Sequence, residues 1–303
     1  MIGFFSRQAI HARKGNAGQA TALFLVVAAT LMSMVFVSIS LHNVAVARVS
    51  CANAVDAIAL NAATWEARSL NMIAALNDGV VQCLRVIRYI CVVWAALAIA
   101  AAFGVGLPAF LEYTQYARKL VSSYWKTAQQ LAEWSEKIRK AAPYIVLGET
   151  VALAKKRNTV GVLFPLDPRG PHDGNNTLEL HLEPGPPIYL TDAISPLSSA
   201  LKRIRKVRFL KGAAKQVASL LNTALGAILG NSNGPIRLLI PEKDFTRRQF
   251  VRFAGSRTAP RLPIPLLGRK EAERVFAEAQ AEPYGGDSDL MTWKSRLTEW
   301  RTK

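Results

Sequence analysis

Residues that build disulfide scaffolds, metal sites and catalytic centres are scarce in this sequence. Its 303 residues include three cysteines and four histidines, too few for a disulfide framework or a zinc ribbon. The motifs His-Glu-x-x-His and Cys-x-x-Cys and the phosphate-binding pattern Gly-x-x-x-x-Gly-Lys are missing. These absences exclude a small disulfide-bonded secreted protein, and they predict a protein with no catalytic residues, no bound metal and no other cofactor.

One segment, Gly104–Ala109, formally fits the dinucleotide-binding pattern Gly-x-Gly-x-x-Ala. A dinucleotide loop normally follows a short strand and has an acidic residue about twenty positions later. Here the segment follows a long apolar run, and Tyr124, Trp125 and Lys126 stand at the later positions. We therefore expect no nucleotide site, and an enzyme is the disfavoured class of function.

Acidic residues are also scarce, and none precedes Asp56. The chain has 38 Lys and Arg against 21 Asp and Glu, a net charge of +17, yet half of its residues are hydrophobic. Residues 1–111 hold seven basic and three acidic residues, whereas residues 112–303 hold 31 and 18. Simple disorder is excluded by the apolar content. The distribution predicts an apolar first third followed by a basic remainder.

The first apolar run, Ala20–Leu41, contains 22 residues without a formal charge. As a helix rising ~1.5 Å per residue it is long enough to cross a hydrocarbon core of ~30 Å. Arg7, Arg13 and Lys14 precede it, which predicts a cytoplasmic N-terminus. The alternative is a cleaved signal peptide, because Ala45-Val46-Ala47 resembles a cleavage site, but the run is longer than the usual ~7–15 residues. We expect an uncleaved membrane anchor.

A second uncharged run, Tyr89–Leu111, also has spanning length. Its alanines and the cluster of Gly104, Gly106 and Pro108 leave a buried core helix as the alternative. A straight helix over residues 20–78 would reach ~50 Å beyond the membrane, whereas the ten residues before Tyr89 span at most ~36 Å. We therefore expect a bend or a reversal, with turn residues at 77–79. Two spans would place residues 112–303 in the cytoplasm, and one span would place them in the periplasm.

Between the two runs, mostly apolar residues recur at alternating spacings of four and three, the period of a coiled-coil seam. Surrounding alanines would let another helix approach closely. The partner helix could belong to the same chain or to another subunit, and the spacing does not separate the two. For the second case, the predicted assembly interface consists of Val55, Asp56, Ile58, Ala62, Trp65 and Met72.

The N-terminal third resembles the Tad (tight adherence) family of Flp-pilus assembly proteins, of the TadE/TadG-like kind. The residues that carry the resemblance are the basic tail, the entry Gly15-Asn16-Ala17-Gly18-Gln19-Ala20, the apolar run, and Asn53 to Ala63, which reads NAVDAIALNAA. They cover about 60 residues. The resemblance implies a membrane-anchored structural component of a pilus assembly or a related secretion machine. Its implied partners are other pilus-assembly or pilin-like membrane proteins.

Two further segments bear on this resemblance. Val275–Glu282 and Trp293–Leu297 look like the terminal Ala-rich helix and Trp-x-x-Arg-Leu tail of some of these proteins. Pilins that are processed share a Gly followed five residues later by Glu, but Leu23 follows Gly18 at that spacing and Ala20 follows Gly15. We therefore expect an unprocessed assembly component rather than a major pilin.

The region beyond residue 111 is mostly helical in pattern. Its expected elements are helices at 112–140, from Pro143 to about Arg157 and at 195–230, strands at 177–183 and 236–240, and a Pro-rich linker at 257–268 before a last helix. One helix carries a basic surface, made of Lys202, Arg203, Arg205, Lys206, Arg208 and Lys211. Such a surface is either simply solvated or in contact with anionic lipid or an acidic partner. Nucleic acid is not expected, because no recognition motif accompanies the charge.

Together these features predict a mainly α protein of the bacterial inner membrane with a minor β element. The expected parts are a basic tail (1–19), the anchor (20–42), an Ala-rich packing helix and turn (43–88), a second apolar helix (89–111), a basic helical domain (112–254), and a linker with a terminal helix (255–303). The alternative to a pilus component is a membrane-tethered scaffold whose basic domain binds anionic lipid or an acidic partner.

Overall fold

The computed structural model describes most of the chain. The described residues are 3–164, 180–206, 213–230, 234–243, 245, 249–259, 273–286 and 291–298, with the side chains of 3–18, 213 and 273 left aside. The chain is mainly helical with a minor β component, as the sequence predicts. It divides into two compact units, which are described separately.

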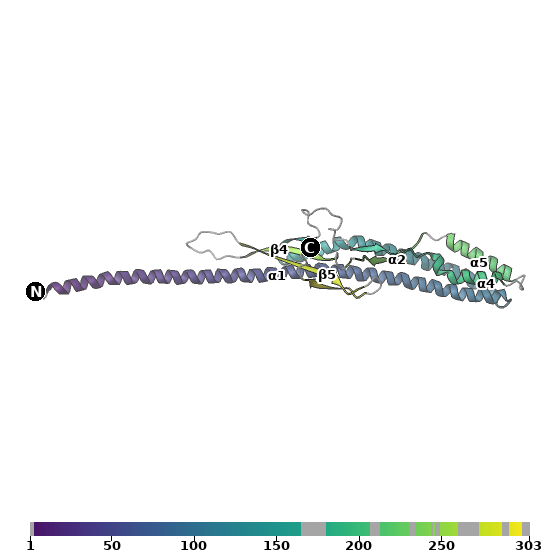
Figure 1. Ribbon diagram of the computed structural model, residues 1–303, viewed down its shortest axis with the longest axis horizontal. Helices are drawn as coiled ribbons and strands as arrows, with labels where there is room; N and C mark the ends of the chain where they lie inside the picture. The colour runs from purple at the N-terminus through teal and green to yellow at the C-terminus, as the bar shows by residue number, and fades with distance from the viewer. Residues whose placement is uncertain are drawn as a thin grey trace. The chain divides into compact units, whose positions relative to one another are not determined.

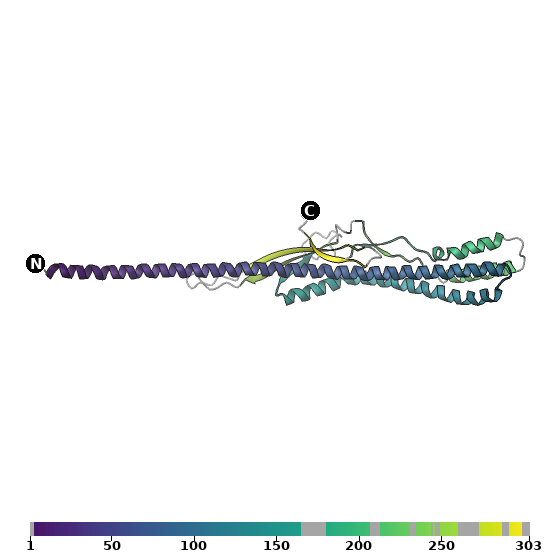
Figure 2. The same ribbon diagram turned by 90° about the horizontal axis from the view of Figure 1, so that it is seen from below.

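The longest element is helix α1, Gly3–Ala102, which is one uninterrupted ribbon in Figures 1 and 2. The turn expected at residues 77–79 is therefore wrong. Asn77 is buried and donates a side-chain hydrogen bond to the carbonyl of Leu239 at 2.8 Å. A Cβ at Gly79 would lie 3.1 Å from Leu131 Cδ1, so glycine there allows helix α2 to approach closely. Tertiary contacts therefore override the local turn preference of this sequence.

The predicted second membrane span is not present as a single helix. Helix α1 ends at Ala102, residues 103–106 form a turn, and helix α2 runs from Leu107 to Lys156. Gly104 and Gly106 have φ values of +85° and +73°, which glycine adopts without strain. Cys91, Trp94 and other members of the apolar run are buried in the core. The alternative of a buried helix in a hairpin is the one observed.

Helix α2 also corrects a predicted boundary. Pro143 lies inside it rather than at the start of a new helix. Proline cannot donate to the carbonyl four residues earlier, but α2 continues through Pro143 with one face packed beside it. Ala142 and Val146, on either side of Pro143, are fully buried.

The first unit consists of Met1–Ile58, Ala152–Val162 and Phe253–Ala279. Most of each of the strands β1 (Val160–Phe164), β4 (Val251–Ala259) and β5 (Glu273–Tyr284) lies in this unit. They belong to a sheet with the order β1-β4-β5-β6, whose strand β6 (Lys294–Thr298) is assigned to the second unit. A Cβ at Gly255 of β4 would lie 2.8 Å from a methyl group of Val55 in α1. The sheet therefore packs directly on the small side chains of α1.

The terminal helix expected within residues 255–303 is wrong, since β4, β5 and β6 occupy this region and the predicted Pro-rich linker is partly strand. Residues 260–272 of that linker lie outside the described residues. In β5, apolar residues stand at every second position from Val275 to Ala281, and polar residues alternate with them from Glu278 to Glu282. This period of two is typical of a strand. Alanine content suggested a helix, but the alternation and the ladder to β6 determine the structure.

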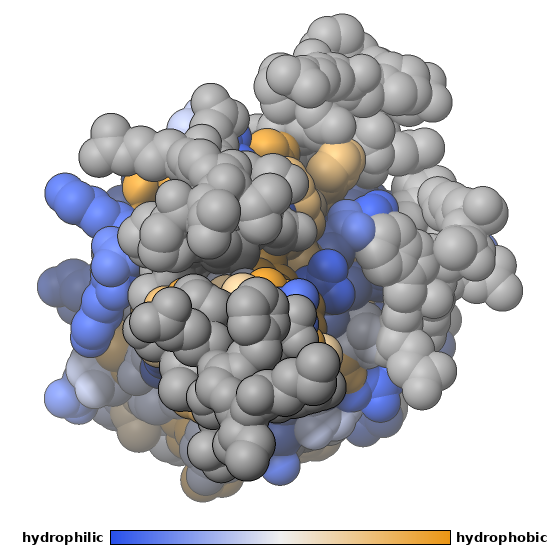
Figure 3. Space-filling view, turned by 90° about the vertical axis from the view of Figure 1, so that its left-hand side faces the viewer, coloured by the Kyte–Doolittle hydropathy of each residue, from blue (hydrophilic) through white to orange (hydrophobic). Residues whose placement is uncertain are grey.

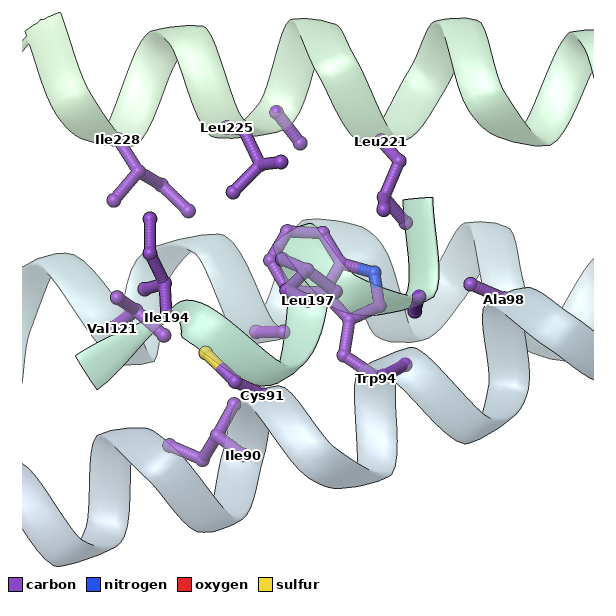
Figure 4. Packing of buried hydrophobic residues seen from close by; sticks show 14 of the residues in the cluster. Ile90, Cys91, Trp94, Ala98, Val121, Ile194, Leu197, Leu221, Leu225 and Ile228 are labelled. Atoms are coloured by element: carbon purple, nitrogen blue, oxygen red, sulfur yellow. The ribbon is translucent and has the colours of Figure 1, made fainter. Parts of the chain in front are cut away.

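The second unit consists of Ala59–Val151, Leu163–Arg252 and Gln280–Lys303. Its helices are the C-terminal part of α1, most of α2, the short α3 (Leu190–Ala193), α4 (Ser195–Lys206) and α5 (Ala213–Gly230). Figure 4 shows how their apolar side chains converge, with Leu221, Leu225 and Ile228 of α5 facing Trp94 and Leu197. Helices were predicted throughout 195–230, and residues 207–212 lie outside the described residues.

Two short strands complete this unit. Strands β2 (Leu182–Pro184) and β3 (Leu239–Pro241) pair antiparallel, as Leu182 opposite Pro241 shows. They overlap the strands predicted at 177–183 and 236–240, although residues 177–179 lie outside the described part of the chain. A second hydrophobic cluster joins these strands to α1. It contains the rings of Phe245 and Trp293, which are tilted by 56° with centroids 4.9 Å apart.

Candidate membrane-facing and assembly surfaces

The predicted anchor, Ala20–Leu41, forms an exposed apolar stretch of α1. Leu23 and Phe24 are 69% and 72% exposed, and no residue of the segment is buried. The hydroxyl groups of Thr30 and Ser33 donate to carbonyls one turn earlier, at 2.7 and 2.8 Å, so these polar groups need no water. Among the described helices, α1 alone is long and apolar enough to cross a membrane. A signal sequence near an N-terminus would pass the same test of length and hydropathy.

Half of the residues predicted to form the assembly interface are buried within the fold of this chain. Val55, Ile58 and Ala62 are fully buried, so the intramolecular alternative applies to them. A second subunit cannot reach these side chains in the folded chain. Trp65 is half-buried, with the guanidinium of Arg68 4.7 Å from its ring centroid.

The remaining predicted interface residues stay accessible. Met72 is 54% exposed, and Asp56 is half-buried. Contact with another subunit remains a prediction for these residues and for Trp65. The apolar spacing predicted a packing face. It did not show which residues of that face are buried in the chain's own fold and which are exposed to solvent.

Polar residues of α1 that sequence reasoning missed hold the C-terminal segment. Asn71 donates to the carbonyl of Trp293 at 3.0 Å and accepts from its backbone N–H at 2.9 Å. Thr64 and Ser295 share a hydroxyl hydrogen bond of 2.8 Å. These partners are more than 220 residues apart in the sequence, and no local pattern marks such pairs.

The second unit contains a buried carboxyl group at Glu66, which is 1% exposed. Burial raises the pKa of Glu66 to about 8. A hydrogen bond from the Gln249 side chain offsets part of this rise. Gln249 Oε1 in turn accepts from the backbone N–H of His181 at 3.0 Å, and His181 Nδ1 lies 3.8 Å from Glu242 Oε2. A neutral Glu66 can donate as well as accept, which suits a buried structural network.

The described residues contain no group of three or more His, Cys, Asp and Glu side chains able to hold a metal ion. All three cysteines are free. Cys51 and Cys91 are buried, and burial raises the pKa of Cys91 to about 12, which disfavours the reactive thiolate form. Cys51 instead donates weakly to the carbonyl of Val275 at 3.6 Å. These thiols behave as the small hydrophobic side chains that the sequence predicts.

The predicted basic surface lies on α4. Lys202, Arg203, Arg205 and Lys206 are exposed, while Leu197, Leu201 and Ile204 on the opposite face are buried. Arg208 and Lys211 lie outside the described residues. In the same unit, Arg118, Lys119 and Lys126 of α2 line a hollow of about 370 Å³. Figure 3 looks from the N-terminal side and so does not present this surface; its coloured residues at the rim are mostly hydrophilic, with hydrophobic ones between them.

The first unit contains a groove of about 520 Å³ along α1, immediately after the apolar stretch. We call it the juxtamembrane groove. Its floor is one face of α1, on which residues recur at helical spacing, and its sides carry two arginines. The lining residues are His42, Ala45, Val46, Val49, Ser50, Asn53, Ala54, Arg157 and Arg257. No sequence pattern marks this site, because Arg157 directly follows α2 and Arg257 belongs to β4, far from residues 42–54 in the chain.

In comparisons with known proteins, no family model matches the chain, and no curated protein or solved structure is significantly similar to it.

Proposed function

We propose that this protein is a membrane-anchored structural component of a Tad-type pilus assembly or a related secretion machine in the bacterial inner membrane. The pilus part of the proposal comes from the N-terminal residues that resemble TadE/TadG-like proteins. The anchored structural role is supported by one observation, the continuity of α1. Its exposed apolar stretch continues without a break into a segment that packs within both units.

A continuous helix has a mechanical consequence for the protein. The proposed membrane segment and the folded part belong to the same helix, so no non-helical linker separates them. Rigid helices suit a component that holds other subunits at a defined place. The fully buried seam residues Val55, Ile58 and Ala62 support a packing role for the part of α1 that follows the apolar stretch.

Site-specific photo-crosslinking in the native bacterium tests the assembly role. A photoreactive amino acid at Met72, the most exposed member of the predicted interface, should give adducts with membrane proteins of the pilus assembly. The same amino acid at Gln82, which is also exposed on α1, is the matched control. Equal adduct patterns at both positions, or none at Met72 in cells that make the pilus, would contradict the proposal.

The second candidate function is a membrane-tethered scaffold that uses its basic surface. It is favoured by the four exposed basic residues of α4, whose opposite face is fixed in the core. Reversing charge with Lys202→Glu and Arg205→Glu should then abolish co-purification of an acidic partner and leave the Met72 adducts unchanged. Loss of the Met72 adducts without loss of the acidic partner would favour the pilus component instead.

A further inference from the structure

We propose that the juxtamembrane groove binds the head group of an anionic phospholipid. This inference deepens the proposed function and rests on its claim that Ala20–Leu41 spans a membrane. The phospholipid would be one whose phosphate is not neutralised by a positive head group, such as a phosphatidylglycerol. Depth, charge and the apolar floor of the groove each support this assignment.

The groove lies at the depth of the lipid head groups. Its first lining residue, His42, follows the last residue of the apolar run directly. The polar layer on each side of a bilayer is about 5–7 Å thick, which corresponds to about four or five residues of a helix perpendicular to the membrane. His42, Ala45 and Val46 therefore meet the phosphate layer. Ser50, which Arg257 contacts, lies ~13 Å beyond Leu41 along a perpendicular helix, so this arginine would reach the phosphate from its aqueous side.

The charge of the groove is positive. Arg157 and Arg257 line it, and none of its nine lining residues is acidic. Arg257 donates from Nη1 to Ser50 Oγ at 2.7 Å, which orients the guanidinium beside α1. A guanidinium has five N–H donors, so several remain to bind a phosphate. Arginine is well suited to this role because its planar group can contact two phosphate oxygens at once.

The floor of the groove distinguishes a lipid from a free phosphate ion. Ala45, Val46 and Val49 are exposed along it, and they would lie against apolar groups if a ligand covered them. A phosphate ion offers no apolar surface, whereas a phospholipid carries its glycerol and the first methylenes of its acyl chains beside the phosphate. A membrane already surrounds the preceding helix in the proposed arrangement, so such a lipid is always close by.

Native mass spectrometry of the full-length protein in detergent tests the inference. The protein is titrated with phosphatidylglycerol and, separately, with zwitterionic phosphatidylcholine of the same acyl chains. We expect tighter binding of phosphatidylglycerol, and a loss of about fivefold for each arginine replaced, so Arg157→Gln with Arg257→Gln should lose about 25-fold. Arg85→Gln with Arg88→Gln removes the same charge from exposed sites of α1 and should leave binding unchanged.

Three outcomes would overturn the inference. These are equal binding of the two lipids to the wild-type protein, unchanged lipid selectivity in the double variant, and displacement of the lipid by millimolar inorganic phosphate, which would indicate a free-anion site. Because Arg257 bonds Ser50, its replacement can perturb the fold. Arg157→Gln alone leaves that bond in place and should still lose about fivefold.

Failure of the inference and failure of the proposed function give different results. If the protein stays in membranes washed with alkaline carbonate but does not select phosphatidylglycerol, the groove assignment fails and the anchor stands. If the wash releases the protein, the anchor fails, and with it the reason to expect a lipid at this depth.

Discussion

At the residue scale, a few small or buried side chains determine how closely other segments pack on α1. Gly255 lies where neighbouring atoms come too close for a side chain, and Gly79 lies where the neighbour is tight. Asn71 and Asn77 bond backbone groups of distant segments. Glu66 is the one fully buried acid of the described residues whose pKa is strongly raised. The consequences of these residues can be measured one substitution at a time.

The buried carboxyl of Glu66 should make stability depend on pH. Between its ordinary pKa of 4.5 and the folded value of about 8, the folded chain holds a proton that the unfolded chain has lost. The free energy of unfolding should therefore fall as pH rises through this window, by up to ~1.4 kcal/mol per pH unit. Glu66→Gln should remove this slope and be more stable than wild type at pH 8.

Denaturation of the full-length protein in detergent at pH 5, 6, 7 and 8 measures the effect. Glu112→Gln, at an exposed position of α2, is the control and should keep the wild-type slope. An unchanged pH slope in Glu66→Gln would show that this carboxyl is ionised in the folded protein.

A side chain at Gly255 should destabilise the first unit. An added Cβ would lie 2.8–2.9 Å from Val55, Thr159 and Phe253, all of which are packed in place. Gly255→Ala should therefore cost about 1–3 kcal/mol of unfolding free energy. Gly148→Ala in α2 meets nothing within 4 Å and should add up to ~1 kcal/mol through helix propensity. If thermal denaturation gives the two variants equal stability, β4 does not approach α1 as closely as described.

At the element scale, the continuity of α1 was the main surprise. The sequence pattern identified helical segments on both sides of residues 77–79 and also identified the seam. It failed at the junction because turn propensity is local, while the contacts of Asn77 with Leu239 and of Gly79 with Leu131 come from segments far along the chain. The C-terminal strands differ in the opposite way, because the local alternation of β5 indicates a strand, whereas the resemblance to an Ala-rich terminal helix implied a helix.

Spin labels on α1 can test its continuity. Met72 and Arg85 are exposed and flank the predicted turn, and 13 residues of helix separate them by ~20 Å along the axis. A reversal would instead bring two packed helices within ~10 Å. Pulsed electron paramagnetic resonance on Met72→Cys with Arg85→Cys, in a chain whose native cysteines are replaced by alanine, should give the longer distance. Labels at Glu112 and Lys126, both exposed on α2, supply a helical reference of similar length.

At the scale of the whole molecule, the proposed membrane arrangement has one candidate span, which would set the topology. With the second apolar run divided by a turn and buried, the described residues contain a single candidate span. The basic tail at Arg7, Arg13 and Lys14 then favours a cytoplasmic N-terminus. Residues 42–303 would lie on the other side of the membrane, which is the one-span alternative of the sequence analysis.

An uncleaved anchor predicts that the mature protein keeps its N-terminal tail. Ala47, the last residue of the cleavage-like sequence, is buried within a continuous helix, and helical backbone is a poor protease substrate. Intact-mass measurement of protein purified from carbonate-washed membranes should therefore include Arg7, Arg13 and Lys14. A mature chain that begins at Asn16 or Gln19 would indicate pilin-type processing, and one that begins after Ala47 would indicate a signal peptide.

Composition and periodicity by themselves determined the exposed apolar run, the mainly helical class and the amphipathic α4, because these depend on residues close together in the chain. Tertiary structure decided the path of α1 through residues 77–79, the burial of the second apolar run, the strands of the C-terminal region and the juxtamembrane groove. Each of these depends on contacts between distant segments, such as Arg257 with Ser50 or Trp293 with Asn71. Local spacing carries no record of such pairs, so only the folded chain brings them together.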